Sequence, residues 1–292
     1  MPARICQAER HGITAKRMRV PVTLQDGGPA FDVTVPNAAR IYDFMLGGKD
    51  NYQADRDAAA RLLEVLPGSI QACQANRGFL QRAVRYLAAA GIRQFIDIGS
   101  GLPTVGNVHQ IAHDLAPDAR VAYVDYDYIV VSHARALLTT SPAVAVIEGD
   151  LRKPADILAH PDLNRLIDFR QPVAVLLLAV LHFLTNDEHP LEVVREITAG
   201  LAPGSYLAIS HVTADHVPAS AAATAQGVYT SASAPVIART RAQVTRLFDG
   251  LELIAPGVTD VSAWHPDSPA GRPHGQSPTA GTYIYGGVAV KR

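Results

Sequence analysis

The chain has 292 residues, a formal net charge of −1 and an apolar fraction of 48%, which allow one large domain or two small ones with an ample core. Two cysteines, Cys6 and Cys73, make neither a disulfide framework nor a metal motif, and no basic block interleaved with aromatic residues indicates a nucleic acid partner. The longest apolar run, Val173 to Leu181, is under half of a membrane span, and residues 1–20 lack the apolar stretch of a secretory signal, so we expect a cytoplasmic protein with no membrane partner.

Residues 1–28 mix charge, glycine and short apolar pieces without a sustained period, and we expect a flexible N-terminal tail. Residues 29–90 are expected to form a helical cap packed on the core. Asn37 can cap its first helix, and Gly47 or Gly48 can end it. The expected helices cover Ala38–Leu46, Asp55–Val65 and Ile70–Ala90. Composition alone favours an ordinary cap over a lid that closes on a ligand.

From residue 91 onward, strands alternate with helices, which is the pattern of a parallel sheet covered on both faces. The expected strands are Gln94–Ile98, Arg120–Asp125, Ala143–Glu148, Val173–Leu178, Ser205–Ser210, Leu251–Val258 and Thr282–Val290. The expected helices are Thr104–Leu115, which starts near Pro103 or Thr104, Ile129–Leu138, Pro154–Leu158, a short helix before Arg170, Asp187–Leu201 and Arg241–Leu247.

Two stretches interrupt the alternation of the core. Residues 211–239 form a long excursion rich in Ala, Ser and Thr, and residues 260–281 are expected to be loop. The last two strands are joined without a full crossover helix, so we expect an antiparallel hairpin at the sheet edge.

The first strand ends in Asp97-Ile-Gly-Ser-Gly101, a glycine turn before a helix. Glycine lets the backbone approach a ligand closely, and the carboxyl ends of strands line the crevice of an open α/β sheet. This turn, with Gly99, Ser100 and Gly101, is therefore a candidate nucleotide-cofactor site. The third glycine of the dinucleotide fingerprint would fall at Thr104, and its absence weakens NAD or FAD. Asp97 would repel a pyrophosphate but suits a ligand that carries an ammonium and a sulfonium.

Acidic side chains also end the next two strands. Asp125 can accept two hydrogen bonds from a ribose diol, with Asp127 as its competitor and Tyr126 as a further candidate contact. Asp150 can accept from an exocyclic adenine amine, with the Leu151 side chain against the ring. A single aspartate here is more simply a helix cap or an Asx-turn. Because the three carboxylates end neighbouring strands of one sheet edge, we favour cofactor binding.

These segments resemble the class I S-adenosylmethionine-dependent methyltransferases over about residues 70–292. The residues that carry the resemblance are Asp97-Ile-Gly-Ser-Gly101, Val124-Asp125, Gly149-Asp150, Ala179-Val-Leu-His-Phe183 and the closing hairpin. The resemblance implies a doubly wound, Rossmann-like α/β fold with a seven-stranded sheet of order 3-2-1-4-5-7-6, in which strand 7 is antiparallel. It also implies S-adenosyl-L-methionine (AdoMet) as the cofactor, bound over the edge of strands 1 and 2.

The N-terminal segment Pro36-Asn-Ala-Ala-Arg-Ile-Tyr-Asp-Phe-Met-Leu-Gly-Gly-Lys-Asp-Asn-Tyr52 is more specific. It resembles an actinobacterial group within that superfamily, the S-adenosyl methyltransferases formerly classed as a domain of unknown function. This resemblance implies that the N-terminal block is a lid over the cofactor. Its candidate cofactor contacts are Tyr42, Lys49, Asn51 and Tyr52.

Methyl transfer requires in-line orientation and exclusion of water, and a general base adds roughly 10²–10⁴-fold for a hydroxyl or protonated amine acceptor. His182, just after the fourth strand, is the candidate base. Its context is similar to that of small-molecule O-methyltransferases, in which the histidine is the base, but Phe183 stands where those enzymes have an acid. Packing at the strand end is the alternative role for His182, and His211 is a second pocket candidate.

The expected function is methyl transfer to an O or N atom of a small-molecule acceptor. Residues 211–239 are the expected specificity region, because long excursions at the carboxyl edge of a sheet tend to be binding loops or lids. Two alternatives stay open: a non-catalytic protein that binds AdoMet or S-adenosylhomocysteine, and an NAD-dependent oxidoreductase.

Overall fold

The computed structural model of the protein describes residues 32–104, 106–139, 141–265 and 283–292. Within it, Thr34–Arg292 form one compact unit, which is described by itself. The tail predicted for residues 1–28 lies outside the described residues, as does most of the loop predicted for residues 260–281.

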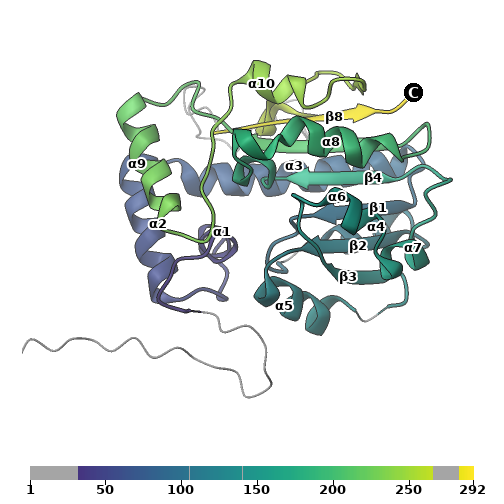
Figure 1. The fold of residues 1–292 in the computed structure, drawn as a ribbon, viewed down its shortest axis with the longest axis horizontal. Helices are drawn as coiled ribbons and strands as arrows, with labels where there is room; N and C mark the ends of the chain where they lie inside the picture. Colours follow the sequence, from purple (N-terminus) through teal and green to yellow (C-terminus); the bar gives the residue numbers. More distant parts are fainter. Residues whose placement is uncertain (1–31, 105, 140, 266–282) are drawn as a thin grey trace, which may run out of the picture. The chain divides into compact units, whose positions relative to one another are not determined.

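The described strands form one mixed sheet. They are β1 (Gln94–Ile98), β2 (Arg120–Asp125), β3 (Val144–Glu148), β4 (Ala174–Leu178), β5 (Tyr206–Val212), β6 (Glu252–Leu253), β7 (Thr259–Asp260) and β8 (Ile284–Val290). Their order is β3-β2-β1-β4-β5-β8-β6, and β7 also pairs with β8 (Figure 1). β1 to β5 are parallel, whereas β8 runs antiparallel to its neighbours. The predicted order is confirmed, with β8 in the place of the predicted seventh strand.

Helices cover both faces of the sheet, as predicted. One face carries α3 (Ser69–Ala89), α4 (Val108–Leu115) and α5 (Tyr128–Leu138), and the other carries α6 (Pro154–Leu158), α7 (Pro161–Leu166), α8 (Pro190–Ala199) and α10 (Arg241–Arg246). Because successive strand residues point to opposite faces, Phe95 packs in the first cluster and Ile96 in the second. None of the described helices combines the length and apolar character needed to cross a membrane.

A second, smaller core forms the cap. It joins α1 (Ala38–Met45) and α2 (Gln53–Val65) to α9 (Ala219–Thr230), which lies in the predicted excursion. Its buried residues include Ile41, Leu62 and Val228. Figure 1 shows these three helices beyond the carboxyl ends of the parallel strands, so segments far apart in the sequence make the cap together.

Two buried carboxylates hold the N-terminal part of the cap. Asp55 is fully buried and accepts hydrogen bonds at 2.8 Å from Nε of Arg40 and from the backbone N–H groups of Asn37 and Tyr52. Asp43 accepts from the Asp50 N–H and from Nδ2 of Asn51, both at 2.9 Å. These two carboxylates can be buried because each accepts several hydrogen bonds from the polar segment around it.

Several predicted element boundaries are wrong. α4 begins at Val108 and not near Thr104, because Gly106 has a φ of 77° and Asn107 forms a capping box with Gln110. The helix predicted to begin at Asp187 is a 3₁₀ turn over Asn186–Glu188 followed by α8. Pro190 disfavours helical backbone at the residue before it, and His189 takes a φ of 49° there.

The strand predicted for residues 251–258 is also wrong in extent. Only Glu252–Leu253 pair as β6, because Pro256 has no N–H to donate and Gly257 turns the chain with a φ of 79°. β5, by contrast, continues two residues beyond the predicted Ser210, to Val212.

The turn after β1 depends on two glycines with different surroundings. Gly99 and Gly101 have φ values of 74° and 66°, which L-residues with side chains rarely adopt. A Cβ atom on Gly99 would lie 2.3 Å from Cγ2 of Val180, whereas nothing lies within 4 Å of one on Gly101. Gly99 is therefore required for both its backbone angles and its size.

We predict that Gly101→Ala lowers the free energy of unfolding by about 1–2 kcal/mol, the cost of the left-handed backbone. Gly99→Ala should cost about 1–3 kcal/mol more, because it adds an overpacked contact with Val180. Urea denaturation of the two variants measures the difference. Equal losses would contradict the steric role of Val180.

We predict that Asp55→Ala lowers the free energy of unfolding of the cap by about 3–5 kcal/mol, because it leaves the Arg40 guanidinium buried without its carboxylate partner. Native-state hydrogen exchange should show loss of protection in α1 and α2, with the amides of the sheet protected as before. Asp57→Ala is the matched control, since Asp57 is exposed on the same helix and bonds only to the exposed Gln53 side chain. A similar loss in both variants would contradict this account of the cap.

Candidate functional site

Backbone hydrogen bonds draw the ends of β1, β2 and β3 together. The Gly99 N–H donates to the Val124 carbonyl at 2.8 Å, and the Gly149 N–H donates to the Asp125 carbonyl at 2.9 Å. The Gly101 N–H donates to Oδ2 of Asp125 at 2.9 Å. The predicted residues of the three strand ends therefore share one edge of the sheet: Asp97, Gly99, Ser100, Gly101, Asp125, Tyr126, Asp150 and Leu151.

Asp97 is a buried carboxylate at the end of β1. Its exposed fraction is 5%, and no hydrogen bond or ion pair joins its side chain to the residues that the structure describes. Burial raises the pKa of Asp97 to about 7, Arg77 opposes this shift, and Asp125 adds to it. A cation placed beside Asp97 would restore the charged form, because opposite charge lowers a carboxyl pKa.

Asp125 is also buried, but its oxygens have partners. Oδ2 accepts from the Gly101 N–H and Oδ1 from the Asp127 N–H, at 2.9 and 3.0 Å. Burial raises the pKa of Asp125 to about 6, and these two backbone amides oppose the shift. An ionised carboxylate has about four acceptor positions, so about two are left for hydroxyl groups of a ligand.

Asp127, the competitor of Asp125 in the sequence, has a structural role. Its Oδ1 accepts from the Ile129 N–H at 2.8 Å and so caps α5. Its Oδ2 accepts from Nδ2 of Asn37 at 2.6 Å. Asn37 is the N-cap of α1, so this contact ties the cap to the second strand end.

The side chains after β2 and β3 form the rim of the edge. Asp150 accepts from the backbone N–H and from Nε of Arg152, at 3.0 and 2.8 Å. The same guanidinium lies 5.4 Å from the ring centroid of Tyr126, which is 48% exposed. Leu151 is buried and packs in the core cluster of the α6–α8 face.

The four predicted lid contacts divide into different environments. The Tyr42 hydroxyl donates to the Cys73 carbonyl at 3.2 Å and accepts from Nδ2 of Asn76 at 3.0 Å, and burial raises its pKa, so it stays neutral. Asn51 bonds to Asp43 within the cap, Tyr52 is 41% exposed beneath the Arg40 guanidinium, and Lys49 is exposed. Contact of these four residues with a cofactor stays a prediction.

Three polar residues near this edge were not predicted. Asn76 is 4% exposed, and its Oδ1 has no hydrogen-bond partner in the described part of the chain. The next residue, Arg77, donates from Nη2 to the Gly106 carbonyl at 2.9 Å and lowers the pKa of Asp97. Oγ1 of Thr104 is also buried without a described partner. The available signal was the polar pair Asn76-Arg77 inside the long helix α3, where asparagine is a poor helix former.

His182 lies just after β4 and is 5% exposed. Its Nδ1 has no hydrogen-bond partner among the described residues. Burial, aided by His211 and Arg239, lowers its pKa well below the usual range, so the ring is neutral at pH 7.

Aromatic contacts extend from His182 to the cap. Its ring centroid lies 4.4 Å from that of Phe183 and 5.6 Å from that of His211. The Phe183 ring lies 6.4 Å from Tyr229 of α9. The helix of the predicted excursion therefore comes close to the segment that carries the candidate base.

His211 has a well-defined hydrogen-bonding pattern. Its Nδ1 bonds to the Val212 carbonyl at 2.7 Å, which makes Nδ1 the protonated nitrogen. Its Nε2 then accepts from Nη1 of Arg239 at 2.9 Å. Burial is the largest cause that lowers the pKa of His211 to about 3. His211 is thus a neutral buried acceptor whose lone pair is occupied.

Comparison with known proteins identifies the family. A family model described as S-adenosyl methyltransferase matches residues 25–292. A DUF574 family protein from Streptomyces avermitilis is 39% identical, with a TM-score of 0.84 over 89% of this chain and 99% of that protein. A protein from Thermobifida fusca, crystallised as a proposed methyltransferase, is 41% identical, with a TM-score of 0.81 over 89% of this chain and 97% of that protein.

A more distant structure shares the fold alone. The plantazolicin methyltransferase BamL, in complex with a triazolic desmethylPZN analog and SAH, is 12% identical, with a TM-score of 0.51 over 87% of this chain and 96% of BamL. No curated protein matches the chain. Because the family model and the two similar structures each match most of the chain, the chain belongs to the S-adenosyl methyltransferase family. It is a Rossmann-like methyltransferase whose cofactor is AdoMet.

Proposed function

We propose that this methyltransferase methylates an oxygen or nitrogen atom of a small-molecule acceptor, with AdoMet at the ends of β1 to β3 and the acceptor beneath the cap. The observation that carries the proposal is the buried Asp97 carboxylate, which has no hydrogen-bond partner in the described chain and ends the strand next to β2, where Asn37 and Asp127 tie the cap to the sheet edge. A covered edge of this kind suits a small acceptor better than a macromolecule. The formal charge of −1 also gives no general attraction for nucleic acid.

The donor and acceptor groups at the edge fit AdoMet. Asp97 would hold the ammonium group, and Arg77, which influences the same carboxyl, would hold the carboxylate. Asp125 has lone pairs left for the ribose hydroxyls. Gly99 and Gly101 allow close approach of the backbone, and Asp150 and Leu151 would bind the adenine. This assignment accounts for an otherwise costly buried carboxylate.

The acceptor side would be built from His182, Phe183, Asn76 and Tyr229. When bound, AdoMet supplies an electrophilic methyl group on a sulfonium centre. His182 is neutral and accepts the proton that the hydroxyl or N–H group of the acceptor loses. Oδ1 of Asn76 accepts a hydrogen bond from the acceptor, and the rings of Phe183 and Tyr229 exclude water from it.

We predict that AdoMet affinity rises with pH up to about pH 7, because the cofactor binds the ionised form of Asp97, whose pKa is about 7 in the free protein. One pH unit below that pKa, the affinity should be roughly tenfold weaker than for the ionised form, and binding should release a proton. Calorimetry between pH 5.5 and 7 measures this, a range in which an α-ammonium group with a pKa of about 7.7–8.0 stays largely protonated.

Asp97→Asn should bind AdoMet more weakly at pH 7 and should lose the part of the pH dependence centred near pH 7, whereas any part centred near pH 6 belongs to Asp125. Asp114→Asn is the control, because Asp114 is exposed on α4. Wild-type affinity that does not change with pH would remove Asp97 from the ammonium site.

The acceptor class is tested by transfer of a labelled methyl group from AdoMet into a cell extract separated into small molecules, proteins and nucleic acids. We expect label in the small-molecule fraction, and label only in a macromolecular fraction would overturn the proposal. With the labelled acceptor purified, His182→Ala should lower kcat by roughly 10²–10⁴-fold and leave AdoMet affinity unchanged.

The wild-type kcat should stay level from pH 8 to pH 6, because His182 is unprotonated throughout this range. His265→Ala, which changes an exposed histidine outside residues 211–239, is the control and should not alter kcat. A kcat for His182→Ala near that of wild type would assign His182 to packing.

A further inference from the structure

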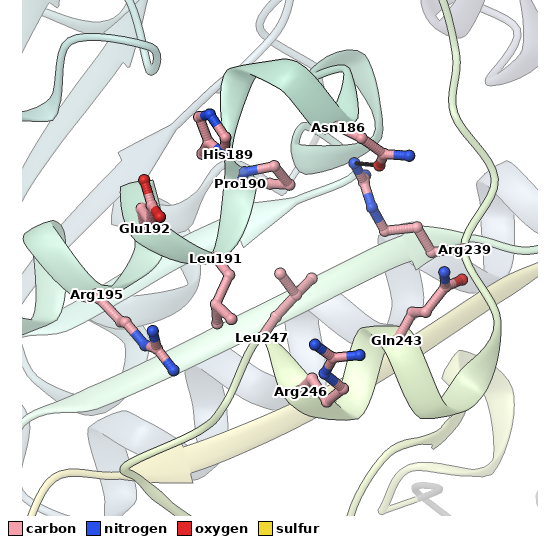
Figure 2. Close-up of a pocket in the computed structure, with 10 residues that line it drawn as sticks. All are labelled: Asn186, His189, Pro190, Leu191, Glu192, Arg195, Arg239, Gln243, Arg246 and Leu247. Carbon is pink, nitrogen blue, oxygen red and sulfur yellow. Dashed lines mark hydrogen bonds between the residues drawn. The ribbon is translucent and has the colours of Figure 1, made fainter.

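A groove lies between α8 and α10, and Arg239, whose guanidinium bonds to the buried His211 ring, is one of the residues that line it. Its volume is about 290 Å³, close to the lower limit for small-molecule sites. Figure 2 shows the ten side chains that line it: Asn186, His189, Pro190, Leu191, Glu192, Arg195, Arg239, Gln243, Arg246 and Leu247. None of them belongs to the predicted AdoMet or acceptor residues, so the groove is a second site to be explained.

The lining is strongly positive. Three arginines face one carboxylate, Glu192, which gives the lining a net charge of +2 with His189 neutral. The chain as a whole has a formal charge of −1, so the groove concentrates positive charge that the rest of the molecule lacks. Positive charge gathered in a concave site raises the local concentration of anions.

Arg239 is a buried cation without a carboxylate beside it. It is 5% exposed, and no carboxylate oxygen lies within 4 Å of its guanidinium among the described residues. Nη1 donates to the Leu181 carbonyl and to Nε2 of His211, at 3.1 and 2.9 Å. Nη2 donates to the Leu184 carbonyl and to Oδ1 of Asn186, at 3.0 and 3.1 Å. All four acceptors are neutral, whereas buried charges are usually paired.

The two other arginines are available at the mouth of the groove. Arg246 is exposed and forms no ion pair with the described residues. Arg195 lies 4.0 Å from Asp249, and both side chains are at least half exposed, so this pair contributes little. An anion in the groove could therefore contact both guanidinium groups without breaking a strong ion pair.

The floor and lip of the groove have a different character. Pro190 and Leu247 are buried, and Leu191 is half-buried, which gives an apolar surface between the arginines. At the lip, His189 has a φ of 49° and a ψ of 57°, an uncommon backbone conformation for a residue other than glycine.

We propose that the α8–α10 groove binds a small organic anion that has an apolar body. Arg195 and Arg246 contact the charged group, the positive field of Arg239 stabilises it, and Leu191 and Leu247 contact the apolar part. The site is separate from the AdoMet edge and does not depend on the identity of the methyl acceptor.

Arg239 connects the α8–α10 groove to the segment after β4. Arg239 holds the carbonyls of Leu181 and Leu184, which flank His182. Asn186, bonded to the same guanidinium, lines the groove itself. An occupant of the groove therefore lies one side chain away from the contacts that hold the His182 segment.

Calorimetry on the full chain at constant ionic strength tests the proposal, with phenyl phosphate as the probe. We expect saturable binding to the wild type, weaker binding of inorganic phosphate, and no saturable binding of benzyl alcohol, which has the ring without the charge. The double variant Arg195→Gln/Arg246→Gln should weaken phenyl phosphate binding about tenfold or more, which is about 1.4 kcal/mol. Glu192→Gln should tighten it severalfold, because it removes the one carboxylate of the lining.

The matched control is Arg165→Gln/Arg170→Gln, which changes two exposed arginines that pair with Asp162 and Asp168 outside the groove. It should bind phenyl phosphate as the wild type does. S-adenosylhomocysteine affinity, measured on every variant, should be unchanged and so shows that each variant is folded. The proposal is overturned by no saturable binding to the wild type, by equal binding to the groove double variant, or by competition between phenyl phosphate and S-adenosylhomocysteine.

Discussion

The close approach of Gly99 to Val180 is the constraint on which the cofactor edge depends. Just after β1, the Gly99 N–H donates to the Val124 carbonyl of β2. This contact requires that no side chain on Gly99 collide with Val180 in the segment after β4. That approach brings the ends of β1, β2 and β4 to one place. It also leaves Asp97, two residues earlier, buried on the α3 side of the sheet, where burial raises its pKa and a cation is the natural complement.

The cap depends on polar contacts as much as on its apolar core. Its first helix begins at Asn37, whose side chain donates to Asp127, while the Ala38 N–H donates to Oγ of Ser233 at 3.1 Å. The strand edge, the N-terminal helices and the segment after α9 therefore meet at the start of α1. Arg40, Asp43 and Asp55 stabilise the inside of the cap, and Asn37 ties the cap to the strand edge. These contacts explain the motif without requiring each of its residues to touch a ligand.

The sheet could be predicted from the sequence because its strands are short apolar runs bounded by turn residues, as at Gln94–Ile98 and Arg120–Asp125, whose predicted bounds are confirmed. Predicted boundaries were wrong where a single proline ended an element that the hydrophobic periodicity would have continued. Pro190 does this before α8, and Pro256 does it after β6. The carboxylates of the edge were visible as acidic strand ends. Asn76 and Arg77 were not visible in this way, because their position at the edge follows from the packing of α3. That Asn76 Oδ1 has no partner among the described residues is likewise a property of the tertiary structure.

The cap also has a consequence for how the protein is made. Ile41 and Leu62 are translated early, but Ala225 and Val228, which complete their core, emerge only after β1 to β5. During synthesis the apolar faces of α1 and α2 must wait for α9, while strands of the sheet are already available to pair. A nascent chain that stops before residue 219 carries the glycine turn and the acidic strand ends, but the apolar core residues of its α1 and α2 lack the α9 residues that cover them. Exposed apolar surface of this kind is what chaperones bind.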